Sequence, residues 1–256
     1  MVRKVIFKKK IQNIDGREHT VIKSIAYRTE IKDIDTKYGK ITKEQLENAG
    51  KIQTSMNKDA YVIEESFIDK YKAMPRLAQT IPLKDIGFII TSTGLNKDSI
   101  VGESGCGSGG VSCFLAKIVK EIRSYDINDK HIDITKNNLK ELGIENVTVI
   151  KASVYEPLDI EDNYFDVFIL DVPEPKKALN VFDKVKVGGF VISYSPSISQ
   201  NLEFVNSLPE NVELVKTIEV LNRKWKLHKD IAKPEELEIN HSGFMTLVRK
   251  LDHINN

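Results

Sequence analysis

A glycine-rich segment near the middle of the chain has the residue types needed to hold a ligand against the backbone. The apolar run 100–102 leads into Glu103, and glycine then occupies alternate positions at Gly105, Gly107 and Gly109. Glycine adopts positive φ angles without strain and leaves room for a ligand to approach the main chain. We therefore expect a strand, a ligand-binding turn and a helix here. A tight turn that binds nothing is the alternative interpretation.

The residues around this turn favour S-adenosylmethionine over a dinucleotide. Gly105, Gly107 and Gly110 fit the G-x-G-x-x-G pattern of dinucleotide sites, which is weak support by itself. Glu103 stands just before the glycines, where a carboxylate would pair with a cationic amino group and repel a pyrophosphate. Asp126, at the end of the next predicted strand, would accept hydrogen bonds from ribose hydroxyls, which both ligands carry. The spacing E-x-G-x-G-x-G is also common in methyltransferases.

Asp171 is the second residue placed to do chemistry. It follows the apolar run 165–170 and precedes Pro173 and Pro175. A strand would deliver this carboxylate to the carboxyl edge of a sheet, and the prolines would stiffen the loop behind it. When a ring nitrogen attacks a sulfonium methyl group, a fixed carboxylate stabilises the growing positive charge and can accept a proton. We expect Asp171 to be this group; a helix N-cap is the alternative role.

No metal is expected in this chemistry. The five histidines and two cysteines have no spacing typical of metal ligands.

These side chains need a scaffold, and the pattern beyond about Ile81 predicts alternating strands and helices. Such alternation indicates a doubly wound, Rossmann-like α/β sheet with helices on both faces. The last two strands have little helix between them, so we expect an antiparallel strand at the end of the sheet. The predicted strands are 100–102, 122–125, 147–150, 165–170, 189–193, 212–218 and 244–248, and the predicted helices are 85–93, 109–119, 129–142, 175–185 and 199–207.

The first part of the chain has a different pattern of residues. Residues 1–66 predict a small, basic, β-rich domain, and residues 67–256 predict the methyltransferase domain. Residues 66–78 predict a helix that ends near Pro75, because proline disfavours helical conformation in the residue before it. The β-prone runs and intervening turn signals are 5–7, 20–22, 61–63, Asp15-Gly16 and Tyr38-Gly39.

The amino-acid composition is typical of a globular protein. Hydrophobic residues make up 41% of the 256 residues and charged residues 29%, and no apolar run approaches the length of a membrane span. Cys106 and Cys113 would lie too far apart for a disulfide if a helix carries the second one. We therefore expect two free thiols, which suits a reducing cytoplasm.

The net charge of +1 hides an uneven distribution. Residues 1–40 contain eleven Lys or Arg residues against five Asp or Glu residues. A second basic cluster surrounds Trp225 and consists of Arg223, Lys224, Lys226, Lys229 and Lys233. Such clusters are either solvated surfaces or contacts for a polyanion such as nucleic acid, and charge alone does not decide between these interpretations.

Several segments, in this order, resemble the motifs of the archaeal and bacterial tRNA (adenine-58-N1)-methyltransferases. The likeness covers essentially the whole catalytic domain, and the ordered combination is more specific than any one motif. The segments are Arg76-Leu77-Ala78-Gln79 with Lys84-Asp85, Glu103 through Gly109, Leu170-Asp171-Val172-Pro173-Glu174-Pro175, Tyr194-Ser195-Pro196 with Gln200, and His241-Ser242-Gly243-Phe244.

This resemblance implies transfer of a methyl group from S-adenosylmethionine to N1 of adenosine 58, or of adenosines 57 and 58, of the tRNA T-loop. It also implies a cytoplasmic homotetramer with no membrane partner. The target base must be unstacked to expose N1, and the basic residues of 1–66 and 223–233 are candidates for contacts with tRNA phosphates. Asp171 becomes the catalytic carboxylate, and the cofactor-binding residues become Gln79, Glu103, Gly105, Gly107, Ser108, Gly109, Asp126 and Ser153.

Three departures from the family pattern leave alternatives open. Ser153 stands where the family usually has an acid, Pro82-Leu83 replaces a Tyr or His followed by Pro, and Gly102 replaces a bulkier strand residue. One alternative is a catalytically weakened tRNA-binding subunit. Another is a methyltransferase for a different substrate, such as isoaspartyl protein or a corrinoid precursor. The intact Asp171 with its prolines favours tRNA methylation over both.

Overall fold

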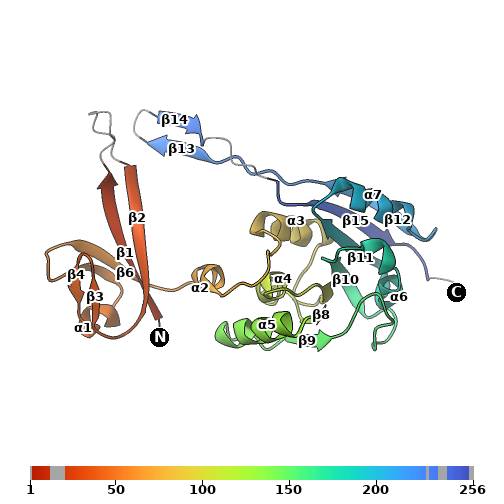
Figure 1. The fold of residues 1–256 in the computed structure, drawn as a ribbon, viewed down its shortest axis with the longest axis horizontal. Coiled ribbons are helices and arrows are strands. Elements are labelled where there is room, and N and C mark those ends of the chain that lie inside the picture. The colour runs from red at the N-terminus through yellow and green to blue at the C-terminus, as the bar shows by residue number, and fades with distance from the viewer. Residues whose placement is uncertain (1, 12–20, 229–230, 236–240, 254–256) are drawn as a thin grey trace. The chain divides into compact units, whose positions relative to one another are not determined.

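The computed structural model describes residues 2–11, 21–228, 231–235 and 241–253. By its internal contacts the chain forms two compact units (Figure 1). The first combines Met1–Ala73 with Lys224–Glu236, and the second combines Met74–Arg223 with Leu237–Asn256.

The first unit is built on a four-stranded antiparallel sheet, which confirms the predicted β-rich N-terminal region. Its strand order is β2-β1-β6-β5, and a short β3–β4 hairpin and helix α1 accompany it. Alternate residues of β1, including Val5 and Phe7, are buried against Ile41, Leu46 and Val62, as expected for a sheet with one face on a core. The elements are β1 (Val2–Ile11), β2 (Val21–Glu30), β3 (Ile34–Thr36), β4 (Gly39–Ile41), α1 (Lys43–Glu47), β5 (Gly50–Gln53), β6 (Asp59–Glu64) and α2 (Phe67–Ala73).

The turn predicted at Tyr38-Gly39 is confirmed between β3 and β4. Gly39 has a φ of +106°, and a Cβ at this position would lie 2.8 Å from the Met56 nitrogen, so glycine is required here. The turn predicted at Asp15-Gly16 lies outside the described residues. Helix α2 ends at Ala73, two residues before Pro75, as expected from the effect of proline.

A second hairpin belongs to the first unit by its contacts although it comes late in the sequence. Strands β13 (Trp225–His228) and β14 (Ile231–Pro234) pair antiparallel within the basic cluster. The sequence analysis predicted no element here.

The second unit is a seven-stranded mixed sheet, which confirms the predicted Rossmann-like α/β fold. The strand order is β12-β15-β11-β10-β7-β8-β9, and β15 runs antiparallel to both β11 and β12. The expected antiparallel strand is therefore present. The strands are β7 (Ile100–Ser104), β8 (Glu121–Asp126), β9 (Val147–Lys151), β10 (Phe165–Leu170), β11 (Val185–Ser195), β12 (Val212–Ile218) and β15 (Phe244–Lys250).

The order of the parallel strands explains where a ligand can bind. From β7 the chain moves outward through β8 and β9, and it then returns through β10 and β11 on the other side of β7. Because parallel crossovers are right-handed, this reversal puts the connecting helices on opposite faces and opens a crevice at the carboxyl ends of β7 and β10. The helices are α3 (Leu83–Thr93), α4 (Gly110–Leu115), α5 (Asp129–Glu141), the 3₁₀ turn η1 (Pro175–Lys177), α6 (Val181–Lys184) and α7 (Ile198–Asn206) (Figure 1).

The predicted helix 175–185 is wrong. The structure has η1 and the four-residue α6 instead, and β11 begins at Val185, four residues before the predicted strand 189–193. Val185 pairs with Phe165 across a register shift in β10, so pairing with the central strand overrides the local helical pattern.

No helix within the described parts of the chain is long and apolar enough to cross a membrane. Cys106 and Cys113 are both free and buried, which confirms the prediction for the thiols.

Candidate functional site

The glycine-rich segment forms the predicted strand, turn and helix. Gly105, Gly107 and Gly109 have φ angles of +79°, +54° and +76°, a conformation that disfavours other residues. A Cβ at Gly105 would collide with the carbonyl oxygen of Asp171. The glycines therefore allow the turn after β7 to lie directly against the end of β10, which brings the two strongest sequence motifs together.

A cavity of about 310 Å³ lies at this carboxyl edge. Six of the predicted site residues line it, namely Gln79, Gly105, Gly107, Asp126, Ser153 and Asp171. Glu103, Ser108 and Gly109 are absent from the lining. The cavity is large enough for a small-molecule ligand.

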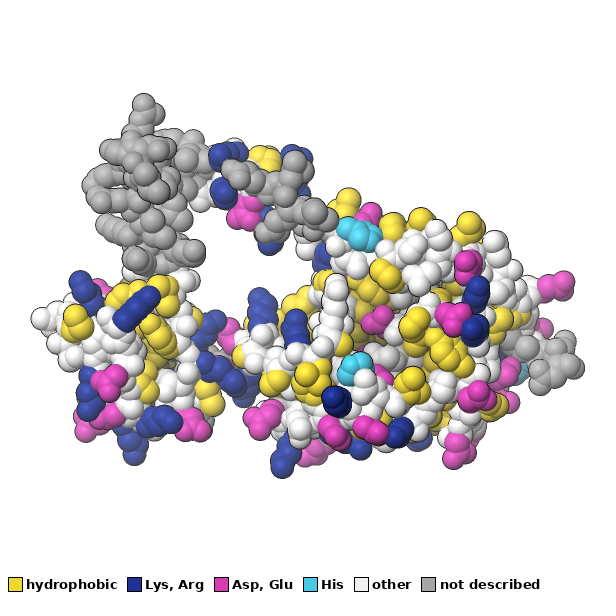
Figure 2. Space-filling view, in the orientation of Figure 1, with side chains coloured by type: hydrophobic (Ala, Val, Ile, Leu, Met, Phe, Trp, Pro, Cys, Tyr) yellow, Lys and Arg dark blue, Asp and Glu magenta, His cyan; other side chains and the backbone are white. Residues whose placement is uncertain are grey.

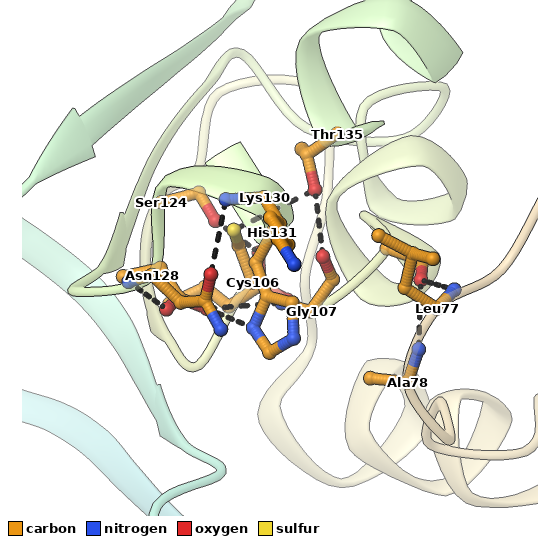
Figure 3. Close-up of polar contacts among 12 residues, drawn as sticks. Leu77, Ala78, Cys106, Gly107, Ser124, Asn128, Lys130, His131 and Thr135 are labelled. Atoms are coloured by element: carbon orange, nitrogen blue, oxygen red, sulfur yellow. Dashed lines mark hydrogen bonds and ion pairs between the residues drawn. The ribbon is translucent and has the colours of Figure 1, made fainter. Parts of the chain in front are cut away.

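Asp126 ends β8 with its carboxylate fixed by the backbone. One oxygen accepts a hydrogen bond from the Gly107 nitrogen at 3.2 Å, and the other accepts one from the Asn128 nitrogen at 2.9 Å. The His131 Nδ1 atom lies 3.3 Å from the first oxygen (Figure 3). The remaining lone pairs are available to donors in the cavity, such as hydroxyl groups.

Glu103 lies behind the glycine turn. Its side chain is buried and accepts hydrogen bonds from the Ser112 and Ser124 hydroxyls, the latter at 2.7 Å. Burial raises the pKa of this carboxyl to about 7. In this arrangement Glu103 joins β7, β8 and α4 to one another instead of facing the cavity.

Ser108 and Gly109 shape the turn from the side away from the cavity. The Ser108 hydroxyl accepts hydrogen bonds from the Leu77 and Ala78 nitrogens at 2.8 and 3.3 Å (Figure 3). This fixes the segment whose next residue, Gln79, lines the cavity. Gly109 caps the N-terminus of α4. Both residues therefore position other parts of the site.

Asp171 continues the chain beyond β10 and faces the cavity. Its nitrogen donates to the Ser104 carbonyl at 3.1 Å, and its loop is held by a hydrogen bond from the Glu174 nitrogen to the Tyr155 hydroxyl at 3.2 Å. Burial raises the pKa of the Asp171 carboxyl to about 7. A half-buried carboxylate of this kind responds to positive charge that develops nearby more strongly than one in open water.

Two of the departures from the family pattern have visible consequences. Ser153 lines the cavity, and its hydroxyl accepts a hydrogen bond from the Tyr155 nitrogen at 3.2 Å, so a neutral group stands here. Gly102 packs under Phe168, whose ring a Cβ at this position would overlap. The glycine is therefore explained by the size of its neighbour.

Several further residues line the cavity that the sequence pattern did not indicate. His131 lies on α5. Ile127, directly after Asp126, and Val154, shortly after β9, offer apolar surface. The position of His131, close behind Asp126 and inside the first turn of a predicted helix, was the available signal. The apolar positions carried no such signal, because their role depends on the strand ends that surround them.

Comparison with known proteins assigns the family. Residues 60–243, more than half of the chain, match the family model described as the tRNA methyltransferase complex GCD14 subunit. The TrmI tRNA (adenine(57)-N(1)/adenine(58)-N(1))-methyltransferase of Methanocaldococcus jannaschii is 26% identical to this chain, over 86% of this chain and 88% of its own length. The TrmI tRNA (adenine(58)-N(1))-methyltransferase of Thermus thermophilus is 28% identical, over 83% and 86%.

Two further matches bear on the fold and the alternatives. A solved structure of a SAM-dependent O-methyltransferase from Thermotoga maritima superposes with a TM-score of 0.80 at 23% identity, covering 99% of this chain and 94% of that one. This likeness supports the fold. A probable cobalt-precorrin-6B C(15)-methyltransferase from M. jannaschii is 32% identical, but over only 51% of this chain.

Proposed function

The chain belongs to the family of the tRNA methyltransferase complex GCD14 subunit, and from this premise we propose that it methylates N1 of adenosine 58 of tRNA, and adenosine 57 where the substrate has one, with S-adenosylmethionine as methyl donor. The observation that carries this proposal is Asp171, which is half-buried, lines the cavity and has its main chain against the glycine turn.

The cavity residues fit S-adenosylmethionine. Asp126 would accept hydrogen bonds from the ribose hydroxyls, the Gly105–Gly107 backbone would face the amino acid part, and Ile127 and Val154 would cover the adenine ring. Ser153 would meet the adenine edge with a hydroxyl. When bound, S-adenosylmethionine supplies an electrophilic methyl group. Gln79 adds a polar side chain to the lining.

Asp171 would act on the target base. As N1 of adenine gains the methyl group, positive charge spreads over the ring and its amino group becomes more acidic. An ionised Asp171 stabilises that charge and can accept a proton from the amino group. Because burial raises the pKa of Asp171 to about 7, we expect activity to increase as the pH rises through this value.

The first unit and its hairpin would hold the RNA. Lys226 and Lys233 face each other across the β13–β14 pair, and both are exposed. Two like charges in direct cross-strand positions are unfavourable without a counter-ion, and RNA phosphates would supply one. The neighbouring Trp225 and Leu227 are 53% and 75% exposed and offer apolar surface to unstacked bases.

The protein would act as a homotetramer on cytoplasmic tRNA. Exposed apolar side chains gather on α7 and on β12, the edge strand of the sheet, and they support self-association of the second unit. These are Ile198, Leu202, Leu214 and Val215.

Mass spectrometry of nucleosides tests the function most directly. Purified protein, S-adenosylmethionine and unmodified tRNA should yield 1-methyladenosine at position 58, or at 57 and 58. A methylated base of another kind would assign the fold to another substrate. Tight tRNA binding without methyl transfer would instead support the catalytically weakened subunit, the alternative that the neutral Ser153 favours.

A further inference from the structure

The loop that follows Asp171 has few backbone donors with which to hold its own shape. Residues 173–175 are Pro-Glu-Pro, and because proline carries no N–H group, Glu174 provides the single amide hydrogen of this stretch. The stretch lies between the end of β10 at Leu170 and the short η1 turn. Such a loop depends on other elements for a fixed position.

Tyr155 accepts that single amide hydrogen. The Glu174 nitrogen donates to the Tyr155 hydroxyl at 3.2 Å, in a bond that is partly buried. Tyr155 follows β9, and its ring packs against the hydrophobic core of the second unit. The hydroxyl therefore anchors the loop to a rigid part of the molecule.

Two further hydrogen bonds hold the same loop. The Asp171 nitrogen donates to the Ser104 carbonyl of β7 at 3.1 Å. On α7, the Gln200 amide nitrogen donates to the Pro173 carbonyl at 3.0 Å. The Gln200 bond is exposed to solvent, so we expect it to contribute less than the partly buried bond of Tyr155.

Tyr155 also belongs to the wall of the cavity. It lines the cavity together with Val172 and Pro173 of the loop. Its own nitrogen donates to the Ser153 hydroxyl at 3.2 Å, and Ser153 lines the cavity too. The same residue thus connects the cavity wall with the loop that carries Asp171.

A fixed loop matters because the proposed role of Asp171 depends on where its carboxylate lies. Electrostatic stabilisation is strong when the charge is already in place, and a displacement of about 1 Å can cost a large part of the rate. Burial also raises the pKa of Asp171 to about 7. A looser loop would misplace the carboxylate and admit water, which lowers this pKa towards its ordinary value.

We propose that Tyr155 is the positioning residue of this site: its hydroxyl holds the single amide hydrogen of the Pro-Glu-Pro stretch and thereby fixes the Asp171 carboxylate at the cavity, with Gln200 as a weaker second anchor. The inference rests on the proposed function for the role of Asp171. Tyr155 acts through the loop, while Asp171 remains the residue proposed for the chemistry.

The test removes the anchoring hydroxyl and leaves the ring. In Tyr155→Phe we expect kcat at about pH 8 to fall by about 5- to 30-fold, with the affinity for S-adenosylmethionine within about twofold of wild type. Gln200→Met removes the second anchor and keeps the side-chain length, and it should lower kcat by about two- to fivefold. Single-turnover methyl transfer and calorimetry measure the two quantities.

Tyr164→Phe is the matched control. Its hydroxyl also makes a partly buried hydrogen bond, to Glu121 at 2.8 Å, but Tyr164 lies outside the described cavity lining. This variant should react like wild type. An equal loss of kcat in Tyr164→Phe would assign the effect to general stability and overturn the inference.

The pH dependence separates positioning from a loss of stability. We expect the rise of activity with pH to occur about one pH unit lower in Tyr155→Phe than in wild type, because water reaches Asp171 more easily. The deficit in kcat should therefore be larger at about pH 8 than at about pH 6, where the variant keeps more of its Asp171 ionised. A variant that is merely less stable would keep the wild-type midpoint.

A carboxyl titration without tRNA makes the inference independent of the substrate. Carbon-13 NMR of the Asp171 carboxyl in the free protein should show a lower pKa in Tyr155→Phe than in wild type. Wild-type kcat and an unchanged pKa in this variant overturn the inference, while methylation of tRNA still stands. If the wild type leaves tRNA unmethylated, the proposed function fails, and the titration alone decides whether Tyr155 positions Asp171.

Discussion

Charged side chains are placed differently at the cavity of the second unit and on the surface of the first unit. At the cavity of the second unit the carboxylates of Glu103 and Asp126 are buried and meet a few fixed partners, and that of Asp171 is half-buried. Among the described residues of the first unit, three of six ion pairs have both side chains exposed, as in Lys40–Asp33, whose side chains are 49% and 51% exposed. Figure 2 shows Lys and Arg side chains interspersed with Asp and Glu side chains on the visible face of the first unit.

This difference corresponds to two functions of charged side chains, which are catalysis and the binding of a polyanion. A charge that must respond to bond formation is more effective in a dry, fixed site, whereas charges that meet a polyanion must stay accessible and become sensitive to salt. Arg3 is an exception within the first unit, because it is buried and donates to the Leu46 and Glu47 carbonyls. It is a structural cation and does not belong among the RNA-contact candidates.

The largest effect should come from the half-buried carboxylate of Asp171. Asp171→Asn keeps the shape of the side chain but removes its charge, so we expect kcat to fall by about 10²- to 10⁴-fold while S-adenosylmethionine still binds. Single-turnover methyl transfer and calorimetry measure these two quantities. Glu174→Gln, in the same loop but exposed and paired with Lys177, is the control and should keep its activity. Full activity of Asp171→Asn would remove the catalytic role proposed for it.

A smaller effect should come from the accessible charges of the hairpin. Lys226→Glu together with Lys233→Glu should weaken tRNA binding by about tenfold and reduce the slope of log K against log salt by about 1 to 2. Filter binding over a salt series measures both. Lys97→Glu, an exposed lysine of the second unit, is the matched control and should change neither. An unchanged slope in the double variant would mean that the hairpin leaves RNA phosphates untouched.

The pH dependence of folding distinguishes the buried carboxyl from exposed ones. Because burial raises the pKa of Asp171 to about 7, the folded protein keeps this proton between about pH 4 and 7 while the unfolded chain has lost it. This group therefore makes the free energy of unfolding fall as the pH rises through that window. Asp171→Asn lacks this loss and should be more stable than wild type at pH 8, by a few kcal/mol at most, and no more stable at pH 4. Urea unfolding at both values checks the sign.

The smallest effect should come from the neutral position in the cavity. Ser153→Asp restores the charge that the family pattern usually has there, so we expect S-adenosylmethionine to bind about three- to tenfold more tightly. Ser153→Asn, of the same size but neutral, should give a smaller gain. Equal affinity in all three proteins would place the adenine edge away from residue 153.

The sequence predicted the parts of the site that depend on local signals. The glycine turn requires positive φ angles that few other residues adopt, and its strand and helix begin where the pattern predicted, although α4 ends at Leu115, four residues before the predicted end. Asp171 follows an apolar run that became the central strand β10, and the strand predicted at 212–218 matches β12. In each case the neighbours in sequence are also the neighbours that determine the structure.

The parts that were missed depend on contacts between distant segments. The spacing of Glu103 and Ser108 is that of a motif, but spacing does not say which side of the turn a side chain faces. Their partners, Ser124 and Leu77, come from other elements. The direct contribution of Glu103, Ser108 and Gly109 to cofactor binding stays a prediction. The break in the helix predicted at 175–185 likewise depends on pairing with Phe165.

The two buried thiols give the protein a built-in reporter of loop opening. Cys106 belongs to the glycine turn and Cys113 to the helix behind it, and burial raises the pKa of each to about 12, so neither thiol is reactive in the closed fold. A maleimide or an aromatic disulfide can reach Cys106 only while the glycine turn is displaced from its packed position. The rate of thiol modification therefore measures how often the turn opens. A ligand that binds against the turn lowers that rate in proportion to the fraction of the protein that it occupies.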